Sequence, residues 1–219
     1  MRDFHIAADR FSDRRDAGTH LAALLHDLAD RDDVVVLGLL RGGVPVAAAV
    51  ADAIRAPLDV FAVRKLGVPW QPELAFGAVA SGGVRVLNDE VLATLPLPES
   101  VVEEITHREE RALRDRELGL RGDRSPADVQ GRVAVLVDDG IATGSSMRAA
   151  IAALRRRSPA AIVVAVPVAP RQTCEELRPE VDGIVCARMP QPFRAVGAWY
   201  EHFDQTSDEE VRALLGVST

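Results

Sequence analysis

Runs of apolar residues alternate along the chain with segments of helical periodicity. Continuous apolar runs, rich in β-branched residues, occupy residues 34–40, 58–63, 133–137 and 162–168. Such runs are typical of strands that are covered on both faces. Helical patterns follow at residues 45–54, 146–156 and 171–177, and a short strand is expected at residues 184–186. This alternation predicts an α/β fold with an open, mainly parallel sheet and helices on both faces.

Two segments depart from the alternation. Residues 67–83 are rich in proline and glycine, and we expect a mobile loop there that leads into a hairpin with a strand at residues 84–87. Residues 99–121 carry opposite charges four positions apart, as in Glu104 and Arg108, and few apolar residues. This pattern predicts a solvated helix that projects from the body, either as an insertion or as a dimer arm.

Length and charge narrow the possible classes of protein. A chain of 219 residues predicts a single domain spanning residues 1–219. The net charge is −7 without a basic stripe, so no nucleic-acid partner is expected. No apolar run approaches the roughly 18 residues of a membrane span, and no signal-peptide pattern opens the sequence. Cys174 and Cys186 form no metal or redox motif. We therefore expect a cytoplasmic protein that does not bind membranes.

The segment with the strongest chemical pattern is VAVLVDDGIATGSS, residues 133–146. The predicted strand ends at two adjacent carboxylates, Asp138 and Asp139, and the small and hydroxyl residues at 143–146 open a helix. Backbone N–H groups in such a turn can bind a phosphate, and paired carboxylates can accept hydrogen bonds from vicinal hydroxyls or hold a divalent cation. The pattern indicates a ribose 5-phosphate site. A plain strand–turn–helix with exposed aspartates does not account for this clustering.

The same segment resembles the ribose-phosphate motif of type I phosphoribosyltransferases, which use 5-phosphoribosyl 1-diphosphate (PRPP) and Mg²⁺. Gly140 departs from the motif, because the family usually has an aliphatic residue there. The resemblance implies the fold of that family, with a helical insertion at residues 97–124 and a small hood at residues 187–205. It also implies that the ribose and phosphate groups of PRPP bind at Asp138, Asp139, Ala142, Thr143, Gly144, Ser145 and Ser146.

Two further segments resemble the diphosphate site of this family. Residues 40–43 (LRGG) follow the first core strand and resemble its diphosphate loop, which implies a cis peptide between Leu40 and Arg41. Taken alone, this segment could equally be the start of a helix. Arg64 and Lys65, the only lysine of the sequence, resemble the start of the flexible loop that closes over PRPP; solvated basic residues are the alternative. The implied diphosphate contacts are Leu40, Arg41, Gly42, Gly43, Arg64 and Lys65.

The base-binding segments give opposing indications. Residues 73–77 (ELAFG) are similar to a motif of adenine phosphoribosyltransferases, in which Glu73 would be a proton donor. Hypoxanthine–guanine enzymes have an aspartate at the position of Ala142, so this residue argues against their chemistry. Residues 192–201 nevertheless resemble the hood of the hypoxanthine–guanine group, with a shift of one residue. We give Ala142 more weight than the hood resemblance. A shift of one residue in the alignment can change the hood match, but it cannot supply the carboxylate that Ala142 lacks.

The resemblance assigns roles to the remaining candidates. Phe193 would stack on the base, next to Ile141, and Glu201 would join Asp138 and Asp139 as a Mg²⁺ ligand, although its longer side chain replaces an aspartate. For Trp199 and Phe203 we favour packing against the sheet over contact with a base. The candidate catalytic residues are Lys65, Glu73 and Arg41.

The implied reaction is Mg²⁺-dependent phosphoribosyl transfer from PRPP to a nucleobase, with a purine favoured over a pyrimidine. Its products would be a nucleoside 5′-monophosphate and diphosphate, and a homodimer is expected. Two alternatives remain open: a PRPP-binding regulatory or sensor protein without robust catalysis, and a protein whose residues 99–121 dock a partner.

Overall fold

A five-stranded parallel sheet forms the centre of the protein. The computed structural model describes residues 10–95 and 97–217. The strand order is β2-β1-β6-β7-β8, and every neighbouring pair is parallel. This arrangement confirms the predicted open α/β fold. The strands are β1 (Val34–Leu39), β2 (Leu58–Phe61), β6 (Val133–Val137), β7 (Ala161–Val168) and β8 (Gly183–Arg188).

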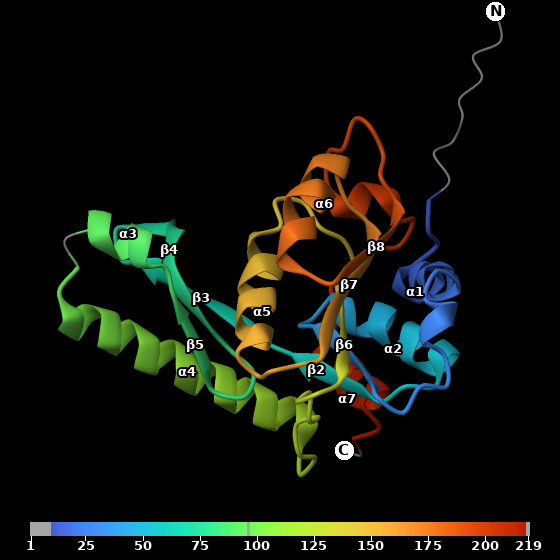
Figure 1. Cartoon of the computed structure of the whole chain (residues 1–219), viewed down its shortest axis with the longest axis horizontal. Coiled ribbons are helices and arrows are strands. Elements are labelled where there is room, and N and C mark those ends of the chain that lie inside the picture. Colours follow the sequence, from blue (N-terminus) through green and yellow to red (C-terminus); the bar gives the residue numbers. More distant parts are fainter. Residues whose placement is uncertain (1–9, 96, 218–219) are drawn as a thin grey trace, which may run out of the picture.

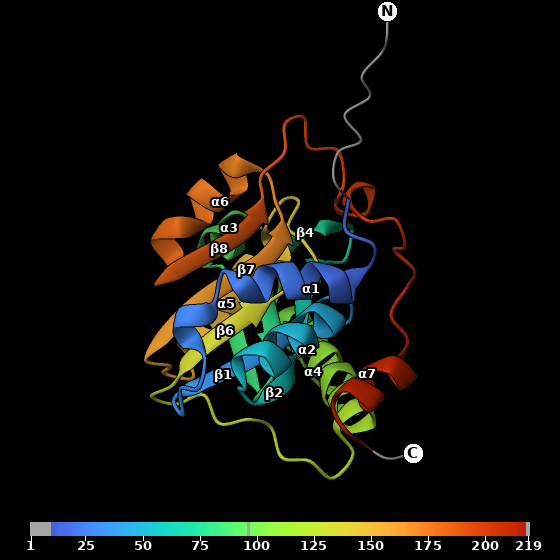
Figure 2. The same ribbon diagram turned by 90° about the vertical axis from the view of Figure 1, so that its right-hand side faces the viewer.

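Helices cover both faces of this sheet, as the continuous apolar strands predict (Figures 1 and 2). Alternate residues of β1 point to opposite sides: Val35 and Leu37 pack in the core beneath α5, while Val34 and Val36 pack against α1 and α2. All four side chains are at most 1% exposed. The covering helices are α1 (Arg14–Ala23) and α2 (Gly43–Ile54) on one face and α5 (Ser145–Arg155) and α6 (Arg171–Leu177) on the other.

A second, antiparallel sheet projects from the body and replaces the loop expected at residues 67–83. Its order is β3-β4-β5, and the strands are β3 (Val63–Val68), β4 (Gln71–Ala80) and β5 (Val84–Leu87). The residues that suggested a loop occupy special places in this sheet. The β3–β4 register shifts on both sides of Gly67, and Gly82 and Gly83 turn the chain with positive φ angles. A Cβ at Gly77 would lie 2.4 Å from the carbonyl oxygen of Val86, so glycine lets the strands approach.

The helix predicted at residues 99–121 is present as α4 (Glu99–Arg121). It runs along the second sheet and, with α3 (Asp89–Thr94), completes an arm that extends from the body (Figure 1). The helix is not solvated all round: Val102, Ile105 and Leu113 are buried against the arm sheet, where they meet Phe76. These apolar positions form a narrow stripe on one face, which the many charges of the helix obscure in the sequence.

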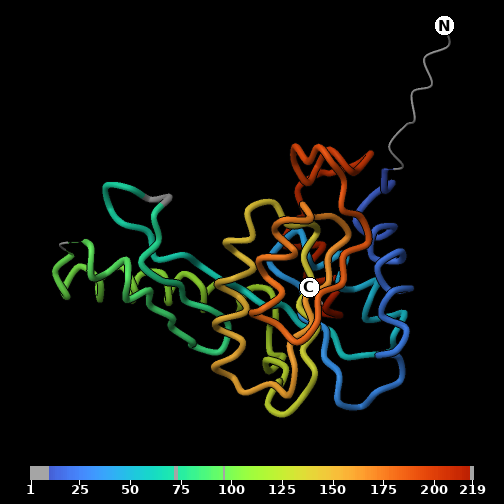
Figure 3. Tube along the Cα trace, turned by 45° about the horizontal axis from the view of Figure 1, so that its top comes forward, coloured from blue at the N-terminus to red at the C-terminus, as the bar shows by residue number. Residues whose placement is uncertain are grey.

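The C-terminal part of the chain returns across the body. After β8, residues 189–205 cross above the central sheet, next to the beginning of the described chain (Figure 3), and Phe11 pairs there with Tyr200 in an isolated bridge. The chain ends in α7 (Asp208–Leu214), where the Ser207 side chain accepts a hydrogen bond from the N–H of Glu210. Short 3₁₀ helices lie at His26–Leu28, Arg178–Glu180 and Val196–Trp199. Within the described ranges, no helix has the length and apolar character needed to cross a membrane.

Candidate active site

The turn between β6 and α5 has the geometry of an anion site. Gly144 has a φ of +77° and stands at the N-cap of α5, and no side chain of the described chain caps this helix. The N–H groups of the first helical turn are therefore available to a ligand. A cavity of about 200 Å³ lies against this turn, lined by Asp138, residues 140–147 and Val196. The side chains of Thr143, Ser145 and Ser146 are exposed at the turn.

Asp138 and Asp139 lie at the carboxyl end of β6, beside this turn. The N–H of Asp139 donates a 2.9 Å hydrogen bond to Oδ1 of Asp138. Burial, and then the neighbouring charge of Asp139, raise the pKa of Asp138 well above its ordinary value. Burial also raises the pKa of Asp139, against the opposing effect of Arg14. Both carboxyls therefore hold a proton more readily than an exposed aspartate does.

Arg14 is a site residue that the sequence did not reveal. Its Nε donates a 2.8 Å hydrogen bond to Oδ2 of Asp139, although 125 positions separate the two residues. Its Nη1 donates to the carbonyl oxygen of Asp204, and its guanidinium lies 3.9 Å from the ring centroid of Phe203. The hydroxyl of Tyr200 donates to the carbonyl oxygen of Asp139. No local motif marks Arg14, because only the fold brings α1 and residues 200–204 to the end of β6.

The loop at residues 40–43 lies directly against the aspartate pair. The peptide bond between Leu40 and Arg41 is cis, as the resemblance implied. A Cβ at Gly42 would lie 2.1 Å from Oδ2 of Asp139, and a Cβ at Gly43 would lie 2.6 Å from the carbonyl oxygen of Val137. Side chains at these positions would collide with the end of β6. The two glycines therefore bring the two loops together at neighbouring strand ends.

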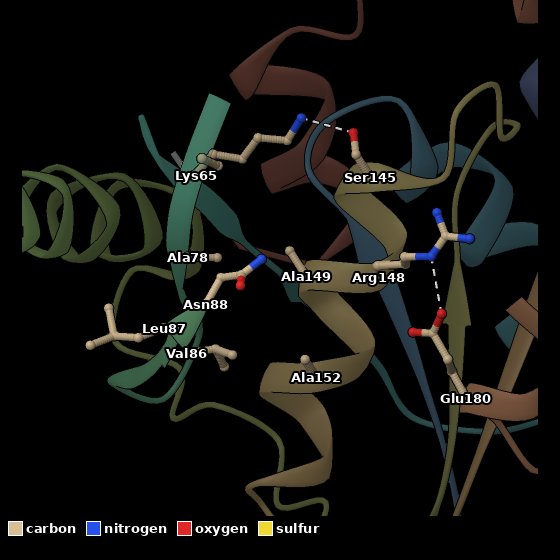
Figure 4. Close-up of a pocket in the computed structure, with 12 residues that line it drawn as sticks. Lys65, Ala78, Val86, Leu87, Asn88, Ser145, Arg148, Ala149, Ala152 and Glu180 are labelled. Atoms are coloured by element: carbon tan, nitrogen blue, oxygen red, sulfur yellow. Dashed lines mark hydrogen bonds and ion pairs between the residues drawn. The ribbon is translucent and has the colours of Figure 1, made fainter. Parts of the chain in front are cut away.

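The predicted cationic residues separate into two groups. Nζ of Lys65 donates a 2.8 Å hydrogen bond to Oγ of Ser145, which links the arm to the phosphate turn (Figure 4). Arg64 extends from the same strand to Glu109 of α4 at 2.6 Å, and Arg41 lies 3.5 Å from Asp208 of α7. Of these three cations, the structure places Lys65 at the phosphate turn and pairs the two arginines with carboxylates.

A second cavity of about 420 Å³ separates the arm sheet from α5. Lys65 and Ser145 stand at one end, and Arg148, which bonds to Glu180 at 3.0 Å, stands on the side of α5 (Figure 4). The walls between them are formed mostly by small and aliphatic side chains, among them Ala78, Val86, Leu87, Ala149 and Ala152.

The predicted base-binding and metal-binding residues do not all meet. Ile141 lines the cavity at the phosphate turn but is only 3% exposed, and Phe193 packs partly buried near Tyr200. Glu201 is exposed, and the described residues contain no cluster of three His, Cys, Asp or Glu side chains suited to a metal. The structure therefore does not gather Glu201 with the two aspartates. The backbone of Glu73 lies in β4, and its side chain is outside the described part of the structure.

The hood explains two features of the sequence. Trp199 packs partly buried with Phe11 and Tyr200, as favoured from the sequence. Phe203 lies 4.9 Å from the ring of Tyr200 but is 37% exposed, so the packing against the sheet favoured for it stays a prediction. A Cβ at Gly140 would lie 2.5 Å from a methyl group of Val196. The hood valine thus fills the space that the aliphatic residue of the motif would need.

Comparison with known proteins identifies the family. The model of the phosphoribosyl transferase domain matches residues 9–193. Proteins from two strains of Mycobacterium tuberculosis, each named "Putative phosphoribosyl transferase", are 47% identical over 205 residues, which is 94% of this chain and 46% of each relative. The chain therefore spans about half the length of these curated relatives. The crystal structure of TT1426 from Thermus thermophilus is 45% identical and has a TM-score of 0.84, covering 94% of this chain and 97% of that one. This chain belongs to the phosphoribosyl transferase domain family.

Proposed function

We propose that this domain transfers the phosphoribosyl group of PRPP to a nucleobase nitrogen in a Mg²⁺-dependent reaction. The bond between C1 of the ribose and the diphosphate oxygen breaks, a bond from C1 to the base nitrogen forms, and that nitrogen releases its proton. The products are a nucleoside 5′-monophosphate and diphosphate. The observation that carries the proposal is the meeting of three segments: the phosphate turn, the 40–43 loop against the aspartate pair, and Lys65 bonded to Ser145.

Each of these segments binds a different part of PRPP. The uncapped turn at residues 143–146 receives the 5′-phosphate through N–H groups and hydroxyls. Asp138 and Asp139 accept hydrogen bonds from the two ribose hydroxyls, which fixes the sugar beside the 40–43 loop. Lys65 stabilises negative charge as the diphosphate leaves. Most of the catalysis then comes from positioning and from electrostatic stabilisation.

The donor set suits a magnesium ion that arrives with its substrate. Asp138 and Asp139 provide carboxylate oxygens, but Arg14 already engages Asp139. Mg²⁺ commonly binds one or two protein carboxylates together with substrate phosphates, so a complete protein cage is not required. The aspartate pair would hold the ion, which neutralises diphosphate charge when bound. We do not assign Glu201 to this set, because it is not gathered with the pair.

Ala142 supports a base that needs no carboxylate partner at this position. Its side chain is exposed at the phosphate turn, and its carbonyl oxygen accepts a 2.9 Å hydrogen bond from Thr173. A methyl group there cannot accept a proton from a 6-oxopurine. We therefore favour an adenine-like purine over hypoxanthine or guanine.

The direct test measures diphosphate release from PRPP and Mg²⁺ with adenine, guanine, hypoxanthine, xanthine, uracil and orotate in turn. We expect release with a purine base and formation of the matching nucleoside monophosphate. Calorimetric titration with PRPP is run in parallel. Tight PRPP binding without release for any base would refute the transferase and support the alternative of a PRPP sensor.

Replacement of Arg14 by glutamine is expected to shift the acid limb of the pH–rate profile to higher pH. Arg14 lowers the pKa of Asp139 by hydrogen bond and charge, and it lowers that of Asp138 by charge. Without the guanidinium, both carboxyls keep their protons up to a higher pH and stop accepting hydrogen bonds from ribose there. We expect a shift of about one pH unit in kcat/KM for PRPP, since an opposite charge commonly lowers a carboxyl pKa by about 1–3 units.

Arg15→Gln provides the matched control, because Arg15 is the exposed neighbour on the same helix. Its acid limb should coincide with that of the wild type. Superimposable acid limbs for Arg14→Gln and the wild type would contradict the role assigned to Arg14.

A further inference from the structure

A third cavity, of about 250 Å³, lies behind the 40–43 loop and is lined by three arginines that come from three separate elements. Arg41 belongs to the loop, Arg64 to β3 and Arg116 to α4; Leu40, Ala62, Val63 and Leu113 complete the wall. We call Arg41, Arg64 and Arg116 the arginine cluster. A protein with a net charge of −7 here places three guanidinium groups around one small space.

In the part of the chain that the structure describes, few carboxylates pair with these three arginines. Arg116 donates a 2.7 Å hydrogen bond to Oδ1 of Asp208, and Arg41 reaches the same oxygen at 3.5 Å. Glu109 bonds to Arg64 at 2.6 Å and is shared with Arg108 at 3.0 Å. Among the described residues, two carboxylates thus pair with four guanidinium groups. The excess positive charge makes the cavity a site for an anion with several oxygens, because guanidinium groups bind phosphates through paired N–H donors.

We infer that Arg116 is a third arginine of the diphosphate site, and that Asp208 competes with the diphosphate for Arg41 and Arg116. This inference rests on the proposed function and extends it to two residues outside the family motifs. Arg116 belongs to α4, and Asp208 is the first residue of α7. Their shared oxygen contact places Asp208 where an anionic oxygen of the ligand would pair with the same two guanidinium groups. When diphosphate binds, it therefore replaces the Asp208 carboxylate as the anionic partner of Arg41 and Arg116.

The test titrates the full chain with inorganic diphosphate in the presence of MgCl₂ and follows binding by calorimetry. Arg116→Gln should weaken diphosphate binding about tenfold, the loss expected for one charge-assisted hydrogen bond. Asp208→Asn should strengthen diphosphate binding about threefold or more, because it removes a competing charge that is partly exposed. The two substitutions are expected to change diphosphate affinity in opposite directions. A general folding defect would instead weaken diphosphate binding in both variants.

Arg111→Gln is the matched control, because Arg111 lies exposed on the same helix and does not line the cavity. It should bind diphosphate as the wild type does. Ribose 5-phosphate serves as a second probe: it occupies the turn at residues 143–146, so Arg116→Gln should leave its affinity unchanged. Wild-type diphosphate affinity in Arg116→Gln, or an equal loss for both probes, would overturn the role of Arg116. An unchanged or weaker affinity in Asp208→Asn would overturn the competition.

The outcome also separates this inference from the proposed function. Arg116-dependent diphosphate binding without transfer to any base would uphold the cluster and refute the transferase. Transfer that is indifferent to Arg116→Gln, with unchanged diphosphate affinity, would uphold the transferase and refute the cluster. A wild-type protein that binds neither diphosphate nor PRPP would refute both.

Discussion

Replacement of Lys65 by alanine is expected to lower kcat for diphosphate release by about a hundredfold to a thousandfold, without unfolding the protein. The Lys65 side chain is exposed, and within the described residues it donates one hydrogen bond, to the exposed Ser145, so its loss leaves no described buried group unpaired. Its ammonium group lies beside the phosphate turn, where the proposed reaction would develop charge on the leaving diphosphate. The loss of one electrostatic donor at such a position commonly reduces rates by about this amount. Steady-state kinetics at saturating base and PRPP, together with a thermal unfolding curve, measure both effects.

Arg85→Ala is the companion control for Lys65. Arg85 also lies on the arm sheet, in β5, but it lines none of the three cavities described above. We expect turnover within about twofold of the wild type, as for a surface change away from special features. Wild-type turnover in Lys65→Ala would remove Lys65 from the site.

Replacement of Asp59 by alanine is expected to lower the free energy of unfolding by about 3–5 kcal/mol, which is the usual effect of removing one partner of a buried ion pair. Oδ1 of Asp59 accepts hydrogen bonds from Nε of Arg121 and the N–H of Val60, and Oδ2 accepts from the N–H of Ala127. Asp59 is 5% exposed, and so is Arg121. The substitution would leave two buried donors and one partly buried donor without this acceptor. Chemical denaturation measures the effect.

The charge on Arg121 depends on its carboxylate partners. Burial opposes this charge, but hydrogen bonds and charges from Asp59 and Glu117 outweigh burial and raise the pKa of Arg121 above its ordinary value. Glu117 in turn accepts from Ser81 of the arm. The network therefore joins β2, α4 and the arm sheet, so we expect the arm and the body to lose stability together in Asp59→Ala.

Asp33→Ala supplies the contrast for Asp59. Asp33 forms a two-bond ion pair with Arg31, but both side chains are more than 40% exposed. An exposed pair of this kind contributes at most about 1 kcal/mol. Equal destabilisation by Asp33→Ala and Asp59→Ala would contradict the view that burial sets the effect.

The central sheet could be predicted because its strands are covered on both faces. A strand with two buried faces must be apolar at every position, so the run at residues 133–137 coincides with β6. The arm sheet could not be predicted in the same way. Gly77 lies inside β4 because a neighbouring carbonyl comes too close for a side chain, yet in the sequence it looks like a residue of a loop.

The candidate site divides along a similar line. One continuous segment contains Asp138, Asp139 and the turn that follows, so this part of the site could be predicted from the sequence. Arg14 and Arg116 bond to partners that lie 125 and 92 positions away, and nothing beside them in the sequence indicates those partners. Such residues become visible only when topology has brought distant elements to the same strand ends.

The contact between Gly140 and Val196 has a consequence for the history of the family. The two positions share one volume, so atoms gained at one must be given up at the other. A relative with an aliphatic residue at position 140 would therefore need a smaller side chain at position 196. The residues at the two positions are therefore expected to covary among relatives. Replacing the residue at only one of them would leave a clash or a void between the turn and the hood.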